Sequence, residues 1–354
     1  MRPQLYFLVP GDPATPTGGY IYDRRIADGL RTRGWTVDVQ SPGEGFPAPD
    51  AATRDGAAAL VEALPNGALV VADGLAFGAL PELAQQHAQR LRWVALVHHP
   101  LALETGLGAS EARALFESER RALAVARRVV VTSAATASAL AAYDVPAARI
   151  AVVEPGTAPA PLAEGSGGDT LALLCVATLT PRKGHAVLIE ALAGLRAQRW
   201  VLHCAGSADR DCATAAALQQ AVARHGLAER VVWHGELDET RLNALYARAD
   251  LFVLASFHEG YGMALAEALA RGLPVISCDA GAIADTVPAD AGVLVAPGDV
   301  FALRAALQRV MEEPEHRAAL AAGARAARQR LPTWPMAAER FASVLEGLPA
   351  PGSA

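Results

Sequence analysis

Two glutamates flank a glycine-rich turn in the second half of the chain, in the segment 256–276, SFHEGYGMALAEALARGLPVI. An apolar run ends there, Glu259 follows, and a helix begins near Gly262 or Met263. Glu267 lies a little more than one turn into that helix, so the two carboxylates can reach different parts of one ligand. Carboxylates accept hydrogen bonds from paired hydroxyls, and the first N–H groups of a helix suit phosphate or sugar oxygens. The alternative for each glutamate alone is structural, as a charge favoured by the helix dipole or on a solvated face.

The chain contains one lysine, Lys183, and uses arginine almost everywhere else that it needs a basic residue. It lies in the segment ATLTPRKGHAVLIEAL, where an apolar run ends and a helix starts just after Arg182 and Lys183. The lysine ammonium is a compact point charge, whereas the arginine guanidinium is a planar group, so the two bind different ligands. The lone lysine is therefore a candidate for a specific role. Two adjacent cations at a strand end suit a diphosphate leaving group. The alternative is an accidental surface lysine.

Two adjacent histidines, His98 and His99, end the apolar run RWVALVHH in the first half of the chain. A histidine at a ligand-facing strand end can hydrogen-bond a sugar hydroxyl or a phosphate. A lone histidine is usually structural, but the position of this pair favours a functional role, and His98 is the stronger candidate.

A glycine pair, Gly18 and Gly19, follows the first apolar run and opens a helix in the segment TPTGGY. It could let the backbone approach phosphates, and a plain turn is the alternative. The fingerprint G-x-G-x-x-G is missing after this run, which argues against a dinucleotide-dependent enzyme.

Short apolar runs alternate with helical patterns along the whole chain. Continuous apolar strands that are separated by helices predict a parallel sheet covered on both faces, which is a doubly wound α/β domain. The first half predicts strands at 4–10, 35–40, 68–73, 92–99, 128–133 and 150–156, and helices near 18–33, 52–64, 78–90, 110–126 and 134–143.

The alternation stops in a segment rich in Pro, Ala, Gly and Ser and then restarts. We therefore predict a first domain over 1–160, a linker over about 157–168 and a second domain over 169–333. A final helix over about 334–347 could cross back and pack on the first domain, or it could pack on its own domain. Predicted strands of the second domain lie at 171–177, 200–206, 230–235, 250–256, 273–278 and 292–296.

Composition excludes several classes of protein. A formal charge of −6 argues against nucleic acid as a main partner. The four cysteines are scattered without a C-x-x-C pair, which indicates reduced thiols and no metal site. The first residues are too short an apolar stretch for a secretion signal, so we expect a cytoplasmic protein. Asp209 and Asp211 match the D-x-D pattern of metal-binding sites, but their position before a helix predicts a helix cap.

Membrane contact is expected to be peripheral at most, at the inner face of a membrane. The segment 111–128 carries five arginines that could meet anionic lipid, but its glutamates favour a solvated face.

The segment from Glu259 to Glu267 resembles the E-x7-E signature of retaining glycosyltransferases of family 4, which have the GT-B fold. The resemblance covers almost the whole chain, from the Gly18–Gly19 turn to the tail. It implies two doubly wound, Rossmann-like domains that face a central cleft, one on the acceptor side and one that binds the nucleotide sugar. It also implies transfer of a hexose-type sugar from a nucleotide diphosphate sugar, with retention and without a metal or other cofactor.

This resemblance assigns roles to the second half of the chain. Glu259 matches the glutamate that contacts the donor sugar, and Glu267 matches the one that holds the ribose. The backbone N–H groups of Tyr261, Gly262 and Met263 would serve sugar hydroxyls and phosphate.

Other matches concern the diphosphate, the acceptor and the base. Lys183 matches the diphosphate lysine, and His98 matches the histidine of the cleft. The family often has an arginine earlier in the lysine loop; Thr178 stands there in this chain, so either Arg182 or Thr178 would take that role. The Gly18–Gly19 loop would lie beside the diphosphate and the acceptor. Backbone contacts to the base are expected near Gly235 and Leu237.

We therefore predict a metal-independent hexosyltransferase whose acceptor is a small molecule, a glycan or a lipid. One alternative is a sugar-nucleotide epimerase or hydrolase on the same fold. Another is a non-catalytic sugar-binding subunit, which the joint presence of Glu259, Glu267, Lys183 and His98 disfavours.

Overall fold

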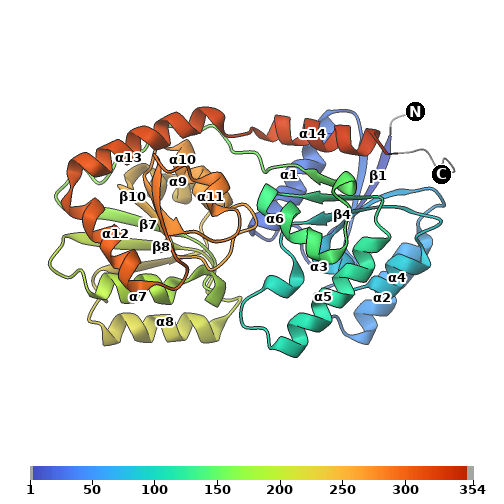
Figure 1. The fold of residues 1–354 in the computed structure, drawn as a ribbon, viewed down its shortest axis with the longest axis horizontal. Helices are drawn as coiled ribbons and strands as arrows, with labels where there is room; N and C mark the ends of the chain where they lie inside the picture. The colour runs from blue at the N-terminus through green and yellow to red at the C-terminus, as the bar shows by residue number, and fades with distance from the viewer. Residues whose placement is uncertain (1–2, 349–354) are drawn as a thin grey trace. The chain divides into compact units, whose positions relative to one another are not determined.

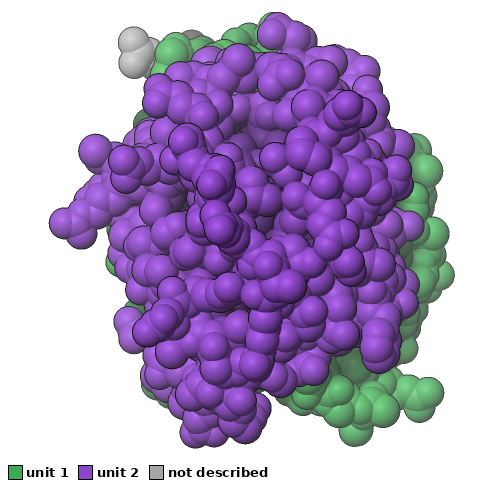
Figure 2. Space-filling view, turned by 90° about the vertical axis from the view of Figure 1, so that its left-hand side faces the viewer, with its two compact units in different colours: residues 1–156, 332–354 green, residues 157–331 purple. Residues whose placement is uncertain are grey.

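The computed structural model describes residues 3–348 and divides them into two compact units. Unit 1 contains the chain up to Gly156 and again from Pro332, and unit 2 contains Thr157–Leu331. Figure 1 traces the chain by residue number, and Figure 2 colours the atoms of each unit separately. The residues of the expected linker fall within unit 2, where Ala163 N–H donates to the Arg271 carbonyl oxygen at 2.8 Å.

Unit 1 is built on a six-stranded parallel sheet in the order β2-β1-β3-β4-β5-β6. Side chains alternate between its two faces: Leu69 and Val71 join one buried cluster, while Val70 and Ala72 join the other. Both faces are therefore apolar, which explains the unbroken hydrophobic runs. The strands are β1 (Gln4–Leu8), β2 (Thr36–Gln40), β3 (Leu69–Asp73), β4 (Arg92–Val97), β5 (Arg128–Val131) and β6 (Ile150–Val152).

Helices cover both faces of this sheet (Figure 1). They are α1 (Gly18–Thr32), α2 (Ala51–Ala63), α3 (Gly74–Phe77), α4 (Pro81–Gln86), α5 (Ala109–Ala124), α6 (Ala134–Ala139) and α14 (Trp334–Glu346), with single 3₁₀ turns at Leu101–Leu103, Leu140–Tyr143 and Ala147–Arg149. The helix expected near 78–90 is shorter than predicted, since α4 covers Pro81–Gln86 and Pro81 begins it.

The C-terminal helix α14 packs along α1 within unit 1. Its buried side chains Phe341, Ala342 and Leu345 join the cluster under α1. The two helices approach closely at Gly29, where a Cβ atom would lie 2.4 Å from the Cβ atom of Ala338. This close approach places α14 against the same sheet as α1.

Unit 2 repeats the design with a six-stranded parallel sheet in the order β12-β11-β10-β7-β8-β9. Its strands are β7 (Leu171–Val176), β8 (Trp200–Ala205), β9 (Val231–Gly235), β10 (Leu251–Leu254), β11 (Val275–Cys278) and β12 (Gly292–Val295). The fold class expected from the sequence, two doubly wound α/β domains, is confirmed by these two sheets.

Unit 2 also has helices between its strands. They are α7 (His185–Ala193), α8 (Cys212–Arg224), α9 (Glu239–Arg248), α10 (Met263–Ala270), α11 (Ile283–Thr286), α12 (Val300–Glu312) and α13 (Pro314–Ala327), with 3₁₀ turns at Pro181–Lys183 and Arg328–Arg330. Asp211 caps α8, since its carboxylate accepts from the Thr214 N–H at 2.9 Å. The cap expected for the D-x-D segment is therefore present.

In each sheet the order of the strands reverses at one place. The reversal lies between β1 and β3 in unit 1 and between β7 and β10 in unit 2. Connections leave in opposite directions there, which opens a crevice beyond the carboxyl ends of the two strands, and ligands of doubly wound folds bind in that crevice. Residues just after these strands are therefore the first to examine.

The arginine-rich segment shows a solvated, charge-paired face. Arg120 pairs with Glu117 at 2.8 Å and with Asp144 at 3.1 Å, and Arg121 pairs with Glu82 at 2.9 Å. Among the helices of residues 3–348, none combines the length and apolar character needed to cross a bilayer.

The contact between α1 and α14 leads to a stability prediction. Gly29→Ala should destabilise unit 1, because the new methyl group meets Ala338, although alanine is the better helix former by about 1 kcal/mol. Gly56→Ala is the matched control: it lies inside α2 and a Cβ there meets no atom within 4 Å, so it should raise the melting temperature. Thermal unfolding of both variants checks this, and stabilisation by both would contradict the packing.

Candidate functional site

Two loops meet at the strand reversal of unit 2. The first follows β7 and contains Lys183, and the second follows β10 and contains Glu259. Phe257 N–H donates to the Arg182 carbonyl oxygen at 2.7 Å. The buried Ser256 hydroxyl lies 3.1 Å from that oxygen and 3.0 Å from the carbonyl oxygen of His258. The backbones of the two loops are thus held together although they lie far apart in the sequence.

Two glycines allow close approaches to the Glu259 loop, one from the Lys183 loop and one from the segment after β11. Gly184 has φ +66°, and a Cβ atom there would lie 1.8 Å from the Ala255 carbonyl oxygen. Gly281 has φ +62°, and its Cβ would lie 2.3 Å from the Glu259 carbonyl oxygen. The Glu259 backbone bridges to Gly281, and its carbonyl oxygen accepts from the Ala282 N–H at 2.9 Å. A side chain at Gly184 would push the Lys183 loop away from the end of β10, and one at Gly281 would push the segment after β11 away from Glu259.

The side chains of Lys183 and Glu259 form a largely buried ion pair. The ammonium nitrogen lies 2.7 Å and 2.9 Å from the two carboxylate oxygens, and the Arg182 guanidinium lies 3.9 Å from one of them. Glu259 is 7% exposed. Burial alone would raise the pKa of its carboxyl, but the charges of Lys183 and Arg182 hold that pKa below its usual value. Glu259 is therefore ionised at neutral pH.

Arg182 is tied to the second loop as well. Its guanidinium donates to the His258 carbonyl oxygen at 2.9 Å. The chain thus places two cations, Arg182 and Lys183, at the mouth of the strand reversal. Thr178, the other residue considered for the second phosphate role, lies earlier in the same loop, where its carbonyl oxygen accepts from the Thr180 N–H.

Glu267 has a different environment, one turn into α10. It accepts a hydrogen bond from the buried Tyr246 hydroxyl at 3.0 Å. Burial raises the pKa of Glu267, while the nearby Arg271 opposes the rise. The Arg271 guanidinium also lies 4.1 Å from the centre of the Tyr246 ring. The structure thus holds the Glu267 side chain in one orientation.

The remaining predicted donor-side residues flank this region. Gly262 has φ +90° and precedes Met263, the first residue of α10. The Tyr261 carbonyl oxygen accepts from the Thr286 hydroxyl at 2.6 Å. Gly235 ends β9 with φ +66°, and Leu237 follows it, half-buried, in the loop before α9.

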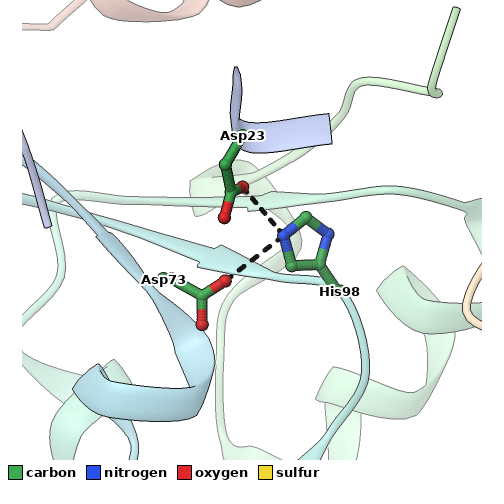
Figure 3. A group of neighbouring side chains, drawn as sticks. All are labelled: Asp23, Asp73 and His98. Atoms are coloured by element: carbon green, nitrogen blue, oxygen red, sulfur yellow. Dashed lines mark hydrogen bonds and ion pairs between the residues drawn. The ribbon is translucent and has the colours of Figure 1, made fainter. Parts of the chain in front are cut away.

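Unit 1 brings His98 together with two carboxylates. Nε2 of His98 lies 3.0 Å from an Asp23 oxygen and 3.4 Å from an Asp73 oxygen (Figure 3). Both aspartates are buried, at 2% and 5% exposure. Asp23 comes from α1, Asp73 ends β3, and His98 follows β4. Gly19 lies beside the ring, because a Cβ there would approach His98 Cδ2 to 3.3 Å, and Gly18 is the first residue of α1.

The charges of this cluster depend on one another. Burial would lower the pKa of His98, but the Asp23 and Asp73 carboxylates outweigh it and raise that pKa to about 10. Burial raises the pKa of Asp23 to about 7. The donor atoms of the three side chains lie within 4.8 Å of one another, a spacing that would admit a metal ion. The hydrogen-bond geometry is also that of an imidazole N–H facing two carboxylates.

The aspartates of this cluster were missed by the sequence analysis, although both leave a signal. Asp73 ends the apolar run ALVVAD, so the strand-end rule that selected His98 selects it too. Asp23 lies between Tyr22 and Ile26 on the buried face of α1, where a charged residue has no place in an apolar stripe.

Residues 163–327 match the family model described as glycosyl transferases group 1. This is nearly the whole of unit 2. The chain is also similar, at 27% identity over 272 residues, to an MMP α-(1→4)-mannosyltransferase of Mycolicibacterium hassiacum; the match covers 72% of this chain and 64% of that protein. The chain spans 26% to 64% of the lengths of the first curated relatives that it matches.

Solved structures confirm the GT-B fold over almost the whole chain. A sucrose-phosphate synthase from Thermosynechococcus elongatus is 23% identical, with a TM-score of 0.84 and coverage of 98% of this chain and 99% of that one. HepE from Anabaena, solved in complex with UDP-glucose, is 19% identical, with a TM-score of 0.79 and coverage of 98% and 100%. This chain is thus similar to glycosyltransferases in both sequence and fold.

The buried ion pair leads to a pH-dependent prediction. Lys183→Met should destabilise unit 2 by about 3–5 kcal/mol at pH 8, because it leaves a buried carboxylate without its main partner. The folded pKa of Glu259 is lowered, so the pair stabilises the protein above the ordinary carboxyl pKa of about 4.3, and this contribution disappears as the pH falls through the folded value. The loss should therefore shrink at pH 5, where the stranded Glu259 takes up a proton.

Urea denaturation measures the loss of stability in Lys183→Met at pH 8 and at pH 5. Hydrogen exchange in peptides of unit 2 shows whether the loss falls in that unit. The control is Arg309→Met, which breaks the exposed pair with Glu313 on α12 and should cost less than about 1 kcal/mol. An equal loss from Lys183→Met at both pH values would contradict the assignment.

Proposed function

We propose that this protein is a retaining glycosyltransferase of family 4 that transfers a hexose-type sugar from a nucleotide diphosphate sugar. The observation that carries the proposal is the meeting of Lys183 and Glu259 at the strand reversal of unit 2. The match of residues 163–327 to glycosyl transferases group 1 supports it. So does the similarity in fold to HepE, whose structure contains UDP-glucose.

In this proposal unit 2 binds the donor. Lys183 and Arg182 hold the diphosphate and stabilise the charge that develops as the sugar leaves. The first N–H groups of α10, including that of Met263, point to sugar or phosphate oxygens. Glu259 accepts hydrogen bonds from hydroxyls of the donor sugar, and Glu267 from those of the ribose. His98 of unit 1 contacts a substrate oxygen.

The transfer itself needs no covalent enzyme intermediate. The bond between the anomeric carbon and the diphosphate oxygen breaks, and an acceptor hydroxyl oxygen bonds to the same face of that carbon. The proton of the acceptor hydroxyl passes to the departing phosphate, so charge and atoms balance. Lys183 and Arg182 supply the positive charge that a metal ion would otherwise provide, and we propose that the reaction is metal-independent. The acceptor is a small molecule, a glycan or a lipid, and the enzyme works in the cytoplasm.

A panel of UDP-, GDP- and ADP-sugars tests the proposal directly. A donor that binds the folded protein stabilises it by RT ln(1 + [L]/Kd), so the melting temperature rises with the donor concentration. We expect one nucleotide class to stabilise the protein, and product to form only when an acceptor is present. Product without an acceptor would instead indicate a hydrolase or an epimerase, and no shift with any donor at millimolar concentration would overturn the assignment. Activity should be unchanged by EDTA.

The ion pair gives the proposal a sharper test. Glu259→Gln should lower kcat about 10²–10³-fold, because the sugar loses a charged acceptor, but it should not weaken binding of the nucleoside diphosphate, since Lys183 is released. Lys183→Ala should lower kcat and also weaken binding of the nucleoside diphosphate. Glu313→Gln and Arg309→Ala, the exposed pair of α12, are the matched controls and should leave both values unchanged. Full activity in Glu259→Gln would instead favour a non-catalytic sugar-binding subunit.

A further inference from the structure

We propose that Asp23 and Asp73 fix His98 as an imidazolium whose Nδ1–H donates a hydrogen bond to a substrate oxygen, so that His98 does not act as a general base. Asp23 and Asp73 are then positioning residues that act through His98. The identity of the acceptor oxygen as part of a substrate rests on the proposed function, whereas the charge state of His98 does not.

Nε2 of His98 faces two carboxylates. An ionised carboxylate only accepts hydrogen bonds, and two of them face this nitrogen at 3.0 Å and 3.4 Å. Nε2 must therefore carry a proton. If Asp23 held that proton instead, the lone pair of Nε2 would still face the Asp73 oxygen, and the two would repel. An Nε2–H group satisfies both acceptors at once, in the neutral ring as well as in the imidazolium (Figure 3). The buried charge of the two carboxylates then decides for the imidazolium.

The negative charges of Asp23 and Asp73 need compensation in the protein interior. Asp23 and Asp73 are almost fully buried, and two unpaired carboxylates so close together would be costly. Asp73 is further committed, because its other oxygen accepts from the Leu75 N–H at 2.7 Å and caps α3. A positive charge on His98 compensates both, which agrees with its raised pKa. Within residues 3–348, the other titratable group against the ring is Tyr22, whose hydroxyl donates to the Val153 carbonyl oxygen at 2.9 Å.

Neighbouring residues hold the His98 ring in one orientation. The Tyr22 ring meets the His98 ring edge-on, with centroids 5.2 Å apart and planes at 80°. Gly19 of α1 packs against Cδ2 of the imidazole. The Thr132 hydroxyl of the segment after β5 lies 3.5 Å from the His98 carbonyl oxygen. Nε2 is thus turned inward, and Nδ1 is the ring nitrogen left to meet a ligand. The His98 side chain is 21% exposed.

Nitrogen-15 NMR of the full chain, labelled on histidine, tests the charge state without any assay of activity. His98→Gln assigns the signals of His98 by their loss. We expect both ring nitrogens of His98 to stay protonated from pH 6 to pH 9. Asp23→Asn should lower the pKa of His98 by more than one unit, towards the ordinary value of about 6.5. Asp73→Asn, which retains an oxygen to cap α3, should lower it less.

The matched control is Asp28→Asn, because Asp28 lies on the same helix but is exposed and pairs with Arg31. It should leave the pKa of His98 unchanged. A wild-type His98 that titrates near pH 6.5, or one whose pKa is unmoved in Asp23→Asn, would overturn the proposal. One equivalent of Zn²⁺ that displaces the Nε2 proton of the EDTA-treated protein would also overturn it, in favour of a metal site.

The pH profile of transfer, measured with the donor that the panel identifies, tests the role of the donated hydrogen bond. Wild-type kcat/KM should show no His98 titration between pH 6 and pH 9. In Asp23→Asn it should fall tenfold or more as the pH rises through the new His98 pKa and recover at pH 6. A loss that is equal at every pH would indicate a merely structural aspartate. If no donor supports transfer, the proposed function fails while the NMR result still decides the charge state.

Discussion

The ion pair between Lys183 and Glu259 is the interaction around which unit 2 is organised. Its 2.7 Å contact requires two loops to meet, and Gly184 leaves no side chain in the way of that close approach. Ser256, buried at the end of the strand, places its hydroxyl beside the carbonyl oxygens of both loops. The site is therefore held by backbone contacts, so that its charged side chains stay available for a ligand.

Unit 1 also pairs a cation with buried carboxylate groups at the strand ends, but with different residues. A cationic ring, His98, is compensated by two buried carboxylates beyond the carboxyl ends of adjacent strands β3 and β4 and beside the first helix. In both units a glycine packs close to the charged group: Gly19 against His98, and Gly184 against the strand that leads to Glu259. Each parallel sheet gathers the residues after its strands at one edge, and each reversal of strand order opens that edge to a ligand.

The sequence predicted the fold class and singled out Lys183, Glu259 and His98, because all three stand where an apolar run ends. It could not predict that Lys183 and Glu259 touch. That contact depends on β10 pairing with β7, and the order of strands in a sheet cannot be read from their order along the chain. The helix predicted near 78–90 was too long: it starts at Pro81, where proline suits the first helical position, and ends at Gln86.

The position of a residue at a strand end could not single out Asp23, because this residue lies inside helix α1. Burying charges costs several kcal/mol each, and an ion pair repays that cost only in part. The carboxylate of Glu259 has no other partner of comparable strength among the described residues than Lys183, with Arg182 more distant. Under the proposed function, a diphosphate offers Lys183 more negative charge than one carboxylate does. Lys183 then exchanges partners when the donor binds, and Glu259 turns from the ammonium to the hydroxyls of the sugar. The same residue that stabilises the empty site is thereby freed to contact the donor at the moment it arrives.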